Sequence, residues 1–272
     1  MKPKGLTDST NSTGRLGRRR NEFLLEVDRR LRKSHGADAL GNKRNPLDEL
    51  IYIQLSVRTR ESAYQATYPA LRRLVGGSWA RLLELSDRQL LDALQGGGMA
   101  TTKISRLRGI TKGIRERFGR VSLAPLKKMS DADAEKILRA LPGVGPKVAR
   151  CVLLYSLDRN VFPVDTHCRR VLTRLGVMRE RVDIKASHDY LQPLVPVGIR
   201  RSLHMNLVHH GRSVCVPRRP KCASCVLLDL CCSKFAQRER REANCSSSPS
   251  ARAGSRTLKR RAARSACARL DT

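Results

Sequence analysis

The chain has 272 residues, of which 40% are hydrophobic and 19 are glycine, a composition that excludes a wholly disordered protein. Its formal net charge of +31 and its pI near 11.0 predict a polyanionic partner, either nucleic acid or an anionic membrane. Because it has neither an apolar run of about 18 residues nor a lipidation signal, we expect no membrane role.

Two basic segments flank the central part of the chain. Residues 1–20 carry a net charge of +5 and residues 233–272 carry +8, which leaves +18 on the part between them. Both segments lack apolar periodicity, so we expect solvated, disordered tails. The first residues lack the apolar stretch of a secretory signal, so the nine cysteines are expected in a reducing compartment, where their clustering favours a metal site over disulfides.

The central part shows helical spacing from its first apolar residues, over 23–31, onward. Three capping residues predict helix starts: Asn45 before a proline, Ser86 three residues before a glutamine, and Ser130. Further helical stretches lie near 104–114, 146–157, 165–175, 184–193 and 198–210. No run alternates convincingly as a strand would, so we predict an all-α fold.

The first chemical motif is Leu-Pro-Gly-Val-Gly-Pro-Lys at 141–147, between two helical stretches. Gly143 and Gly145, on either side of Val144, allow a tight turn whose backbone N–H groups carry little side-chain cover, and Pro146 suits the first position of a helix. Neither a P-loop nor a dinucleotide fingerprint fits this spacing. The motif therefore predicts either a helix-hairpin-helix that grips a nucleic-acid backbone or a plain helix corner.

The second motif is Val-Asp-Thr-His at 164–167, in which Asp165 precedes a helical stretch and is predicted to cap it. The helix dipole keeps such a carboxylate ionised. Lys147 lies near the start of its own helix, where the dipole disfavours the ammonium, and a lysine that loses its proton is a nucleophile. For either residue alone the capping or solvated interpretation is favoured, whereas the pair at this spacing favours catalysis.

The third motif is a cysteine cluster whose four thiolates could converge on one metal centre. Its members are Cys215, Cys222, Cys225 and Cys231, preceded by His-Gly-Arg at 210–212. Thiolate count alone leaves structural zinc and an iron–sulfur cluster equally acceptable. Cys232 is a possible substitute for the last ligand, while Cys151 and Cys168 lie in helical stretches and are expected to be core residues.

The loop at 216–221, between the first two of these cysteines, is called the basic loop below. Arg218, Arg219 and Lys221 give it three positive charges. A metal centre would fix this loop, so we expect its cations to contact DNA phosphates at low entropic cost.

Together, these motifs resemble the endonuclease III family of DNA base-excision glycosylases over roughly residues 21–232. The resemblance implies an all-α, two-lobed fold with a DNA cleft. One lobe would be a helical barrel at 46–158 that contains the hairpin. The other would combine 21–45 with 159–232 and hold a [4Fe–4S] cluster on the four cysteines.

The family's activity implies roles for Lys147 and Asp165 as the catalytic pair. The protein would be a bifunctional glycosylase and abasic-site lyase that removes oxidised pyrimidines and nicks the strand by β-elimination. Its partner would be double-stranded DNA with damaged bases or abasic sites, bound by a monomer in the bacterial cytoplasm or in the eukaryotic nucleus or mitochondrion. Two alternatives stay open: a glycosylase for a mismatched or alkylated base, and a non-catalytic, metal-stabilised DNA-binding protein.

Two positions bear on how the chain would read its substrate. Arg58 stands where the family usually has a glutamine that fills the gap left by a flipped base, and a guanidinium could stack and hydrogen-bond there. Met99, in a Gly-rich turn, is a candidate wedge between base pairs, with an ordinary core role as the alternative.

Overall fold

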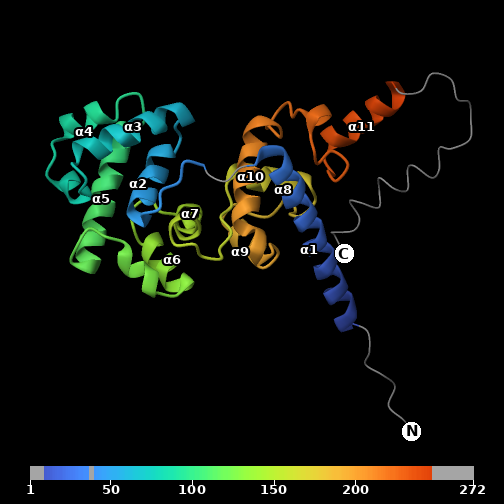
Figure 1. Ribbon diagram of the computed structural model, residues 1–272, viewed down its shortest axis with the longest axis horizontal. Coiled ribbons are helices and arrows are strands. Elements are labelled where there is room, and N and C mark those ends of the chain that lie inside the picture. The colour runs from blue at the N-terminus through green and yellow to red at the C-terminus, as the bar shows by residue number, and fades with distance from the viewer. Residues whose placement is uncertain (1–8, 37–39, 247–272) are drawn as a thin grey trace, which may run out of the picture. The chain divides into compact units, whose positions relative to one another are not determined.

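The computed structural model describes residues 9–36 and 40–246, and over these residues the chain is helical, without a β-strand (Figure 1). The all-α prediction is confirmed. The α-helices are α1 (Ser9–His35), α2 (Pro46–Ser56), α3 (Glu61–Leu74), α4 (Asp87–Ala93), α5 (Ala100–Phe118), α6 (Asp131–Arg139), α7 (Pro146–Ser156), α8 (Thr166–Arg174), α9 (Ser187–Leu191), α10 (Arg200–Ser213) and α11 (Lys234–Ser246). Short 3-10 helices are η1 (Trp79–Leu83), η2 (Ala124–Lys128), η3 (Val197–Ile199) and η4 (Cys222–Ser224). None of the described helices is both long and apolar enough to cross a bilayer.

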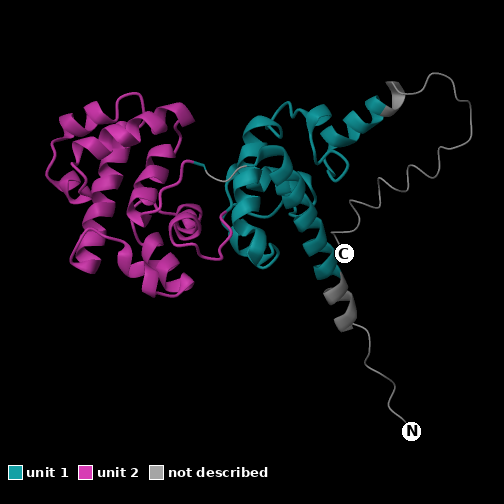
Figure 2. Cartoon of the chain, in the orientation of Figure 1, with its two compact units in different colours: residues 1–40, 164–272 teal, residues 41–163 magenta. Residues whose placement is uncertain are grey.

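The chain folds as two compact units, one formed by residues 1–40 and 164–272 and the other by residues 41–163 (Figure 2). They are called unit 1 and unit 2. The sequence predicts domain boundaries after residues 45 and 158. In the structure the units divide after residues 40 and 163, five residues from each predicted boundary. Unit 1 therefore joins the N-terminal helix to the C-terminal part of the chain, from residue 164 on, and unit 2 is one continuous segment.

Helix starts follow the local capping chemistry of the sequence. The Asn45 side chain accepts hydrogen bonds from the backbone N–H groups of the first turn of α2, which begins at Pro46. Ser86 and Gln89 form a complete capping box on α4, and Ser130 caps α6. All three predicted starts are confirmed, since each depends on residues within one turn.

Unit 2 is organised around α2, which is buried along most of its length and packs against α7. The two helices run antiparallel and are tied at both ends. Gln54 Nε2 donates to the Gly143 carbonyl oxygen at 3.0 Å, and Ser156 Oγ donates to the Lys43 carbonyl oxygen at 2.7 Å. The hairpin that precedes α7 is thereby fixed at the C-terminal end of α2.

In unit 1, α10 packs against both α1 and α8. Asp28 of α1 is buried at this contact and accepts a hydrogen bond of 2.8 Å from Ser202 Oγ of α10. Arg170 of α8 donates to the Gly211 carbonyl oxygen of α10 at 2.7 Å. These contacts join segments that are distant in the sequence.

Both segments predicted to be disordered tails contain helix, which corrects part of that expectation. α1 begins at Ser9, and α11 covers 234–246. α11 is held by Arg240, whose guanidinium donates to the carbonyl oxygens of Leu228 and Cys231, and by the buried Ala236. Because these contacts are mostly polar, the segment has no apolar periodicity from which the helix could be predicted. Residues 1–8 and 247–272 lie outside the described part of the chain.

Candidate functional site

Three turns of unit 2 meet at the C-terminal end of α2, and we call them the turn cluster: residues 57–59, 96–99 and 141–145. The hairpin turn at 141–145 is tied to α2 by the Gln54 bond to Gly143. Thr59 Oγ1 donates to the Gly97 carbonyl oxygen at 2.8 Å and so joins the other two turns. All the unit 2 residues that the sequence analysis assigned to DNA contact therefore lie in one cluster of loops.

Lys103, in the first turn of α5, stabilises this arrangement from inside. Its side chain is buried, and its Nζ atom donates to the Gly97 carbonyl oxygen at 2.6 Å and to Thr59 Oγ1. Burial lowers the pKa of Lys103. Sequence analysis missed this residue, because nothing in a lysine beside a Gly-rich turn shows that its ammonium points inward.

Arg58 and Met99 share an uncommon backbone conformation. Their φ angles are +51° and +52°, in the left-handed region that costs a non-glycine residue about 1–3 kcal/mol. Both side chains are exposed, Met99 by 42%, so the core interpretation of Met99 is wrong. Backbone strain with an exposed side chain at each turn is typical of residues held ready for a ligand.

The hairpin itself is shaped by Gly143, which has a φ of +70°. Any other residue would be strained at this φ, and its Cβ atom would lie 2.9 Å from Cδ of Arg106, whose side chain would have to move. Val144 is buried, and its N–H donates to the Leu141 carbonyl oxygen at 3.1 Å, so it holds the turn in shape. Gly143 and Gly145 are exposed and give a ligand close access to the backbone.

Lys147 is half-buried in the first turn of α7, directly after the hairpin. The helix is capped by Gly145, which has no side chain to occupy the first N–H groups, and such a helix start favours an anion. Lys147 thus lies next to a backbone site suited to a phosphate.

Asp165 of unit 1 is the N-cap of α8, as predicted, and its Oδ1 accepts a hydrogen bond of 2.7 Å from the Cys168 backbone N–H. Cys168 is fully buried, in agreement with its expected core role, and a ligand atom of Asp165 lies within 4.8 Å of one on Cys168 and one on His204. The motif that contains Asp165 also packs against the His-Gly-Arg motif. A Cβ atom on Gly211 would lie 2.7 Å from the Cβ of His167, so glycine is required there.

The four predicted ligands line one hollow in unit 1, together with apolar side chains such as Val214 and Leu228. They are Cys215, Cys222, Cys225 and Cys231. Cys232 does not line it, and its Sγ lies against Gly176, 3.3 Å from where a Cβ would be. This position favours Cys231 over Cys232 as the fourth ligand.

The electrostatics of the hollow fit a cationic centre. Burial, together with charge on the other three thiols, raises the pKa of Cys225 to about 11. Burial and the neighbouring thiols also raise the pKa of Cys222. Four thiolates in this space need a metal to neutralise them. The residues present therefore fit a tetrathiolate metal centre.

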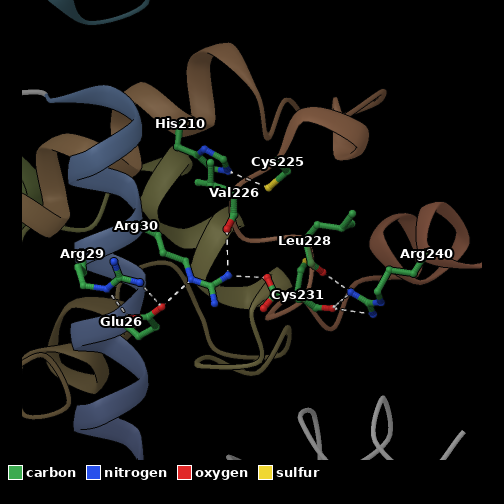
Figure 3. A network of polar contacts seen from close by, with 10 residues as sticks. Glu26, Arg29, Arg30, His210, Cys225, Val226, Leu228, Cys231 and Arg240 are labelled. Atoms are coloured by element: carbon green, nitrogen blue, oxygen red, sulfur yellow. Dashed lines mark hydrogen bonds and ion pairs between the residues drawn. The ribbon is translucent and has the colours of Figure 1, made fainter. Parts of the chain in front are cut away.

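Arginines from three helices bind the backbone of the cysteine loop, at 215–231. Arg174 of α8 donates to Cys215 Sγ at 3.1 Å and to the Pro217 carbonyl oxygen at 2.7 Å. Arg30 of α1 donates to the Val226 carbonyl oxygen at 3.2 Å. Arg240 of α11 donates to the Cys231 carbonyl oxygen at 3.1 Å (Figure 3). The sequence does not reveal these partners, which lie many residues from the cysteines.

His210, the first residue of the His-Gly-Arg motif, contacts the cysteine loop directly. Its Nε2 lies 3.5 Å from Cys225 Sγ, and its Nδ1 lies 3.1 Å from His35 Nε2 of α1. Burial lowers the pKa of His210 to about 4, so the ring is neutral near pH 7. A neutral ring donates from one nitrogen and accepts at the other, so it can connect α1 to the thiol.

The basic loop lies at the surface of unit 1. Its three cationic side chains, Arg218, Arg219 and Lys221, are exposed. Arg174 holds the loop by its bonds to the Val216 and Pro217 carbonyl oxygens. The loop is thus fixed by its backbone while its cations remain available to phosphates.

Comparison with known proteins identifies relatives of this arrangement. The family model described as HhH-GPD superfamily base excision DNA repair protein matches residues 52–196. An endonuclease III of Treponema pallidum is 30% identical over 189 residues, which cover 70% of this chain and 84% of that protein. An Arabidopsis thaliana relative that bears the name of a DNA glycosylase is 30% identical over 166 residues, 61% of this chain, and the chain spans 56% of its length. A solved non-covalent endonuclease III–DNA complex superposes with a TM-score of 0.68 at 21% identity, covering 81% of this chain and 98% of that one, and this likeness concerns the fold.

Proposed function

Because the chain belongs to the HhH-GPD superfamily of base excision DNA repair proteins, and within it to the endonuclease III-like DNA glycosylases, we propose that it is a bifunctional glycosylase and abasic-site lyase acting on oxidised pyrimidines. Its substrate would be damaged or abasic duplex DNA, bound by a monomer in the bacterial cytoplasm or in the eukaryotic nucleus or mitochondrion.

The observation that carries this proposal is the turn cluster together with Lys147. A hairpin with exposed glycines, two strained and exposed side chains, and a lysine in the first helical turn after the hairpin all belong to one unit. The hairpin would grip the phosphate backbone without reading sequence. Arg58 would fill the gap left by an extruded nucleotide, and Met99 would be a wedge between base pairs.

In the proposed reaction, neutral Lys147 attacks the sugar C1′ atom as the damaged base leaves. The C1′–O4′ bond of the sugar then breaks, O4′ takes up a proton, and the new C–N bond becomes a protonated imine. Loss of a C2′ proton then expels the 3′ phosphate in a β-elimination. Asp165 stabilises the positive charge that develops at the sugar and takes part in proton transfer. A nucleophilic lysine thus couples base removal to strand cleavage.

We further propose that the four cysteines hold a [4Fe–4S] cluster. The donor set fits such a group and also fits zinc, and family membership favours the cluster. When bound, it would supply a cross-link between the segment after α10, η4 at the end of the basic loop, and the segment before α11. The arginines already described would keep the loop positioned for phosphate contact.

Borohydride reduction tests the lyase proposal, because it traps the imine as a stable protein–DNA adduct. We expect the adduct with abasic duplex, and expect Lys147→Ala to abolish it while duplex binding remains. Trapping that survives this substitution would overturn Lys147 as the nucleophile. A panel of duplexes that carry oxidised, mismatched or alkylated bases would identify the lesion, and binding with neither base release nor nicking on the whole panel would favour a non-catalytic DNA-binding protein.

A further inference from the structure

A buried carboxylate lies on α2, the helix that packs against the one carrying Lys147. Glu49 is inaccessible to solvent. Its Oε1 accepts a hydrogen bond from Asn42 Nδ2 and its Oε2 accepts one from the Lys43 backbone N–H, each at 2.6 Å. Glutamates are almost never fully buried unless they are paired, and these two donors leave further lone pairs available.

The antiparallel pairing of α2 and α7 brings Glu49 to the level of Lys147. Gln54 meets Gly143 at one end of the pair. Glu49 precedes Gln54 by five residues, and Lys147 follows Gly143 by four residues. At a rise of about 1.5 Å per helical residue, Glu49 lies roughly 7.5 Å from Gln54 along α2. Lys147 is the second residue of α7, directly after the hairpin turn that Gln54 binds, and α2 and α7 are in contact. The positive charge of Lys147 accordingly lowers the pKa of Glu49, against the larger raising effect of burial.

The other groups that face Glu49 do not replace Lys147 as its proton partner. Besides Asn42, they are Lys43 on the preceding loop, Tyr52 on α2 and Tyr68 on α3. The Lys43 ammonium lies 4.4 Å and 4.8 Å from the ring centres of Tyr52 and Tyr68, where the rings stabilise its charge. Burial raises the pKa of both phenols, to about 12 for Tyr68, so neither ionises near neutral pH.

We propose that Glu49 is a positioning residue that accepts the proton of Lys147 and so prepares the nucleophile, an inference that rests on the proposed lyase function. One N–H bond of the ammonium breaks, its proton joins a carboxylate oxygen of Glu49, and Lys147 keeps the electron pair for attack on C1′. A carboxylate of raised basicity suits this transfer, because proton acceptors work best when their pKa lies near the working pH.

The test is the pH profile of borohydride trapping under single-turnover conditions, with the full chain and an abasic duplex. We expect Glu49→Gln to slow trapping roughly 100-fold near pH 7, the lower end for loss of a general base. The deficit should shrink as the pH rises, because hydroxide then removes the lysine proton. Asn42→Ala keeps the carboxylate and deletes one hydrogen bond to its charged form, so the acid limb of the profile should move to higher pH.

Glu135→Gln is the matched control, because Glu135 is a largely buried carboxylate of the same unit and pairs with Arg150 at 3.1 Å. Its pH profile should equal that of the wild type. An equal deficit of Glu49→Gln at every pH, faster trapping by this variant at neutral pH, or an unmoved acid limb in Asn42→Ala would overturn the inference. Absence of trapping in the wild type would overturn the proposed function and this inference together, whereas wild-type behaviour of Glu49→Gln would overturn the inference alone.

Discussion

Replacing Lys103 with methionine tests whether the turn cluster is held in shape from inside. The Lys103 ammonium bonds to Gly97 and Thr59, and these two residues also bond to each other. Methionine is similar in length and apolar, so it fills the same space without a donor. Because the Thr59 hydroxyl still donates to the Gly97 carbonyl oxygen, the substitution leaves that acceptor paired.

The expected size of the effect follows from these contacts. Hydrogen bonds to charged groups contribute about 1.5–3 kcal/mol each, but the cost of burying the ammonium offsets part of this gain. We therefore expect Lys103→Met to lower the free energy of unfolding by about 1–3 kcal/mol. The left-handed conformations of Arg58 and Met99 store strain of about the same size, so both turns should relax in the free protein. Re-forming them on DNA at a cost of about 1.4 kcal/mol would weaken binding about tenfold.

Urea unfolding gives the stability, and fluorescence anisotropy with a duplex that carries a stable abasic analogue gives Kd at several salt concentrations. The slope of log Kd against log salt concentration should not change, because Lys103 faces inward. Loss of a phosphate contact would instead reduce the size of this slope by about 0.9. Lys112→Met, an exposed position on the same helix, is the control for loss of a lysine. An unchanged Kd, or a slope reduced by about one unit, would refute the internal role of Lys103.

Three further outcomes are expected. Cys231→Ser should abolish iron binding measured by elemental analysis, whereas Cys232→Ser should retain it; zinc without iron in the wild type would contradict the cluster. Burial raises the pKa of Asp28, so the folded state binds more protons and its stability falls as the pH rises just above the usual aspartate range. Asp28→Asn should remove this fall in urea unfolding, and the exposed Asp92→Asn should not. Replacing the three cations of the basic loop by glutamine should lower the salt slope of DNA binding by up to about 2.7, and an unchanged slope would exclude phosphate contacts there.

The parts of the fold that sequence predicts are those decided within a few residues. Asn45, Ser86 and Ser130 cap helices because a short polar side chain reaches N–H groups in the next turn. The cysteine spacing shows similar locality, since a loop of seventeen residues can fold back on one hollow. Asp165 is predicted as a cap for the same reason, although its role in catalysis is a proposal.

What sequence could not predict depends on contacts between distant segments. Arg174 reaches Cys215 across 41 positions, and no pattern in either segment marks the pair. Lys103 and Glu49 look like ordinary surface charges until packing shows both to be buried. α11 was missed because a helix held by arginine bonds to carbonyl oxygens carries no apolar stripe.

The strong positive charge of the chain serves two physical purposes. Some cations bind groups inside the units: Lys103 binds oxygens of the turn cluster, and Arg174 binds carbonyl oxygens of the cysteine loop. These groups release no counterions from DNA, so they add nothing to the salt dependence of binding. The net charge of +31 therefore overstates the electrostatic contact with DNA. In the proposed complex with DNA, the exposed cations of the basic loop would contribute to affinity. The turns that the internal cations hold in place would contribute to the geometry of the bound nucleotide.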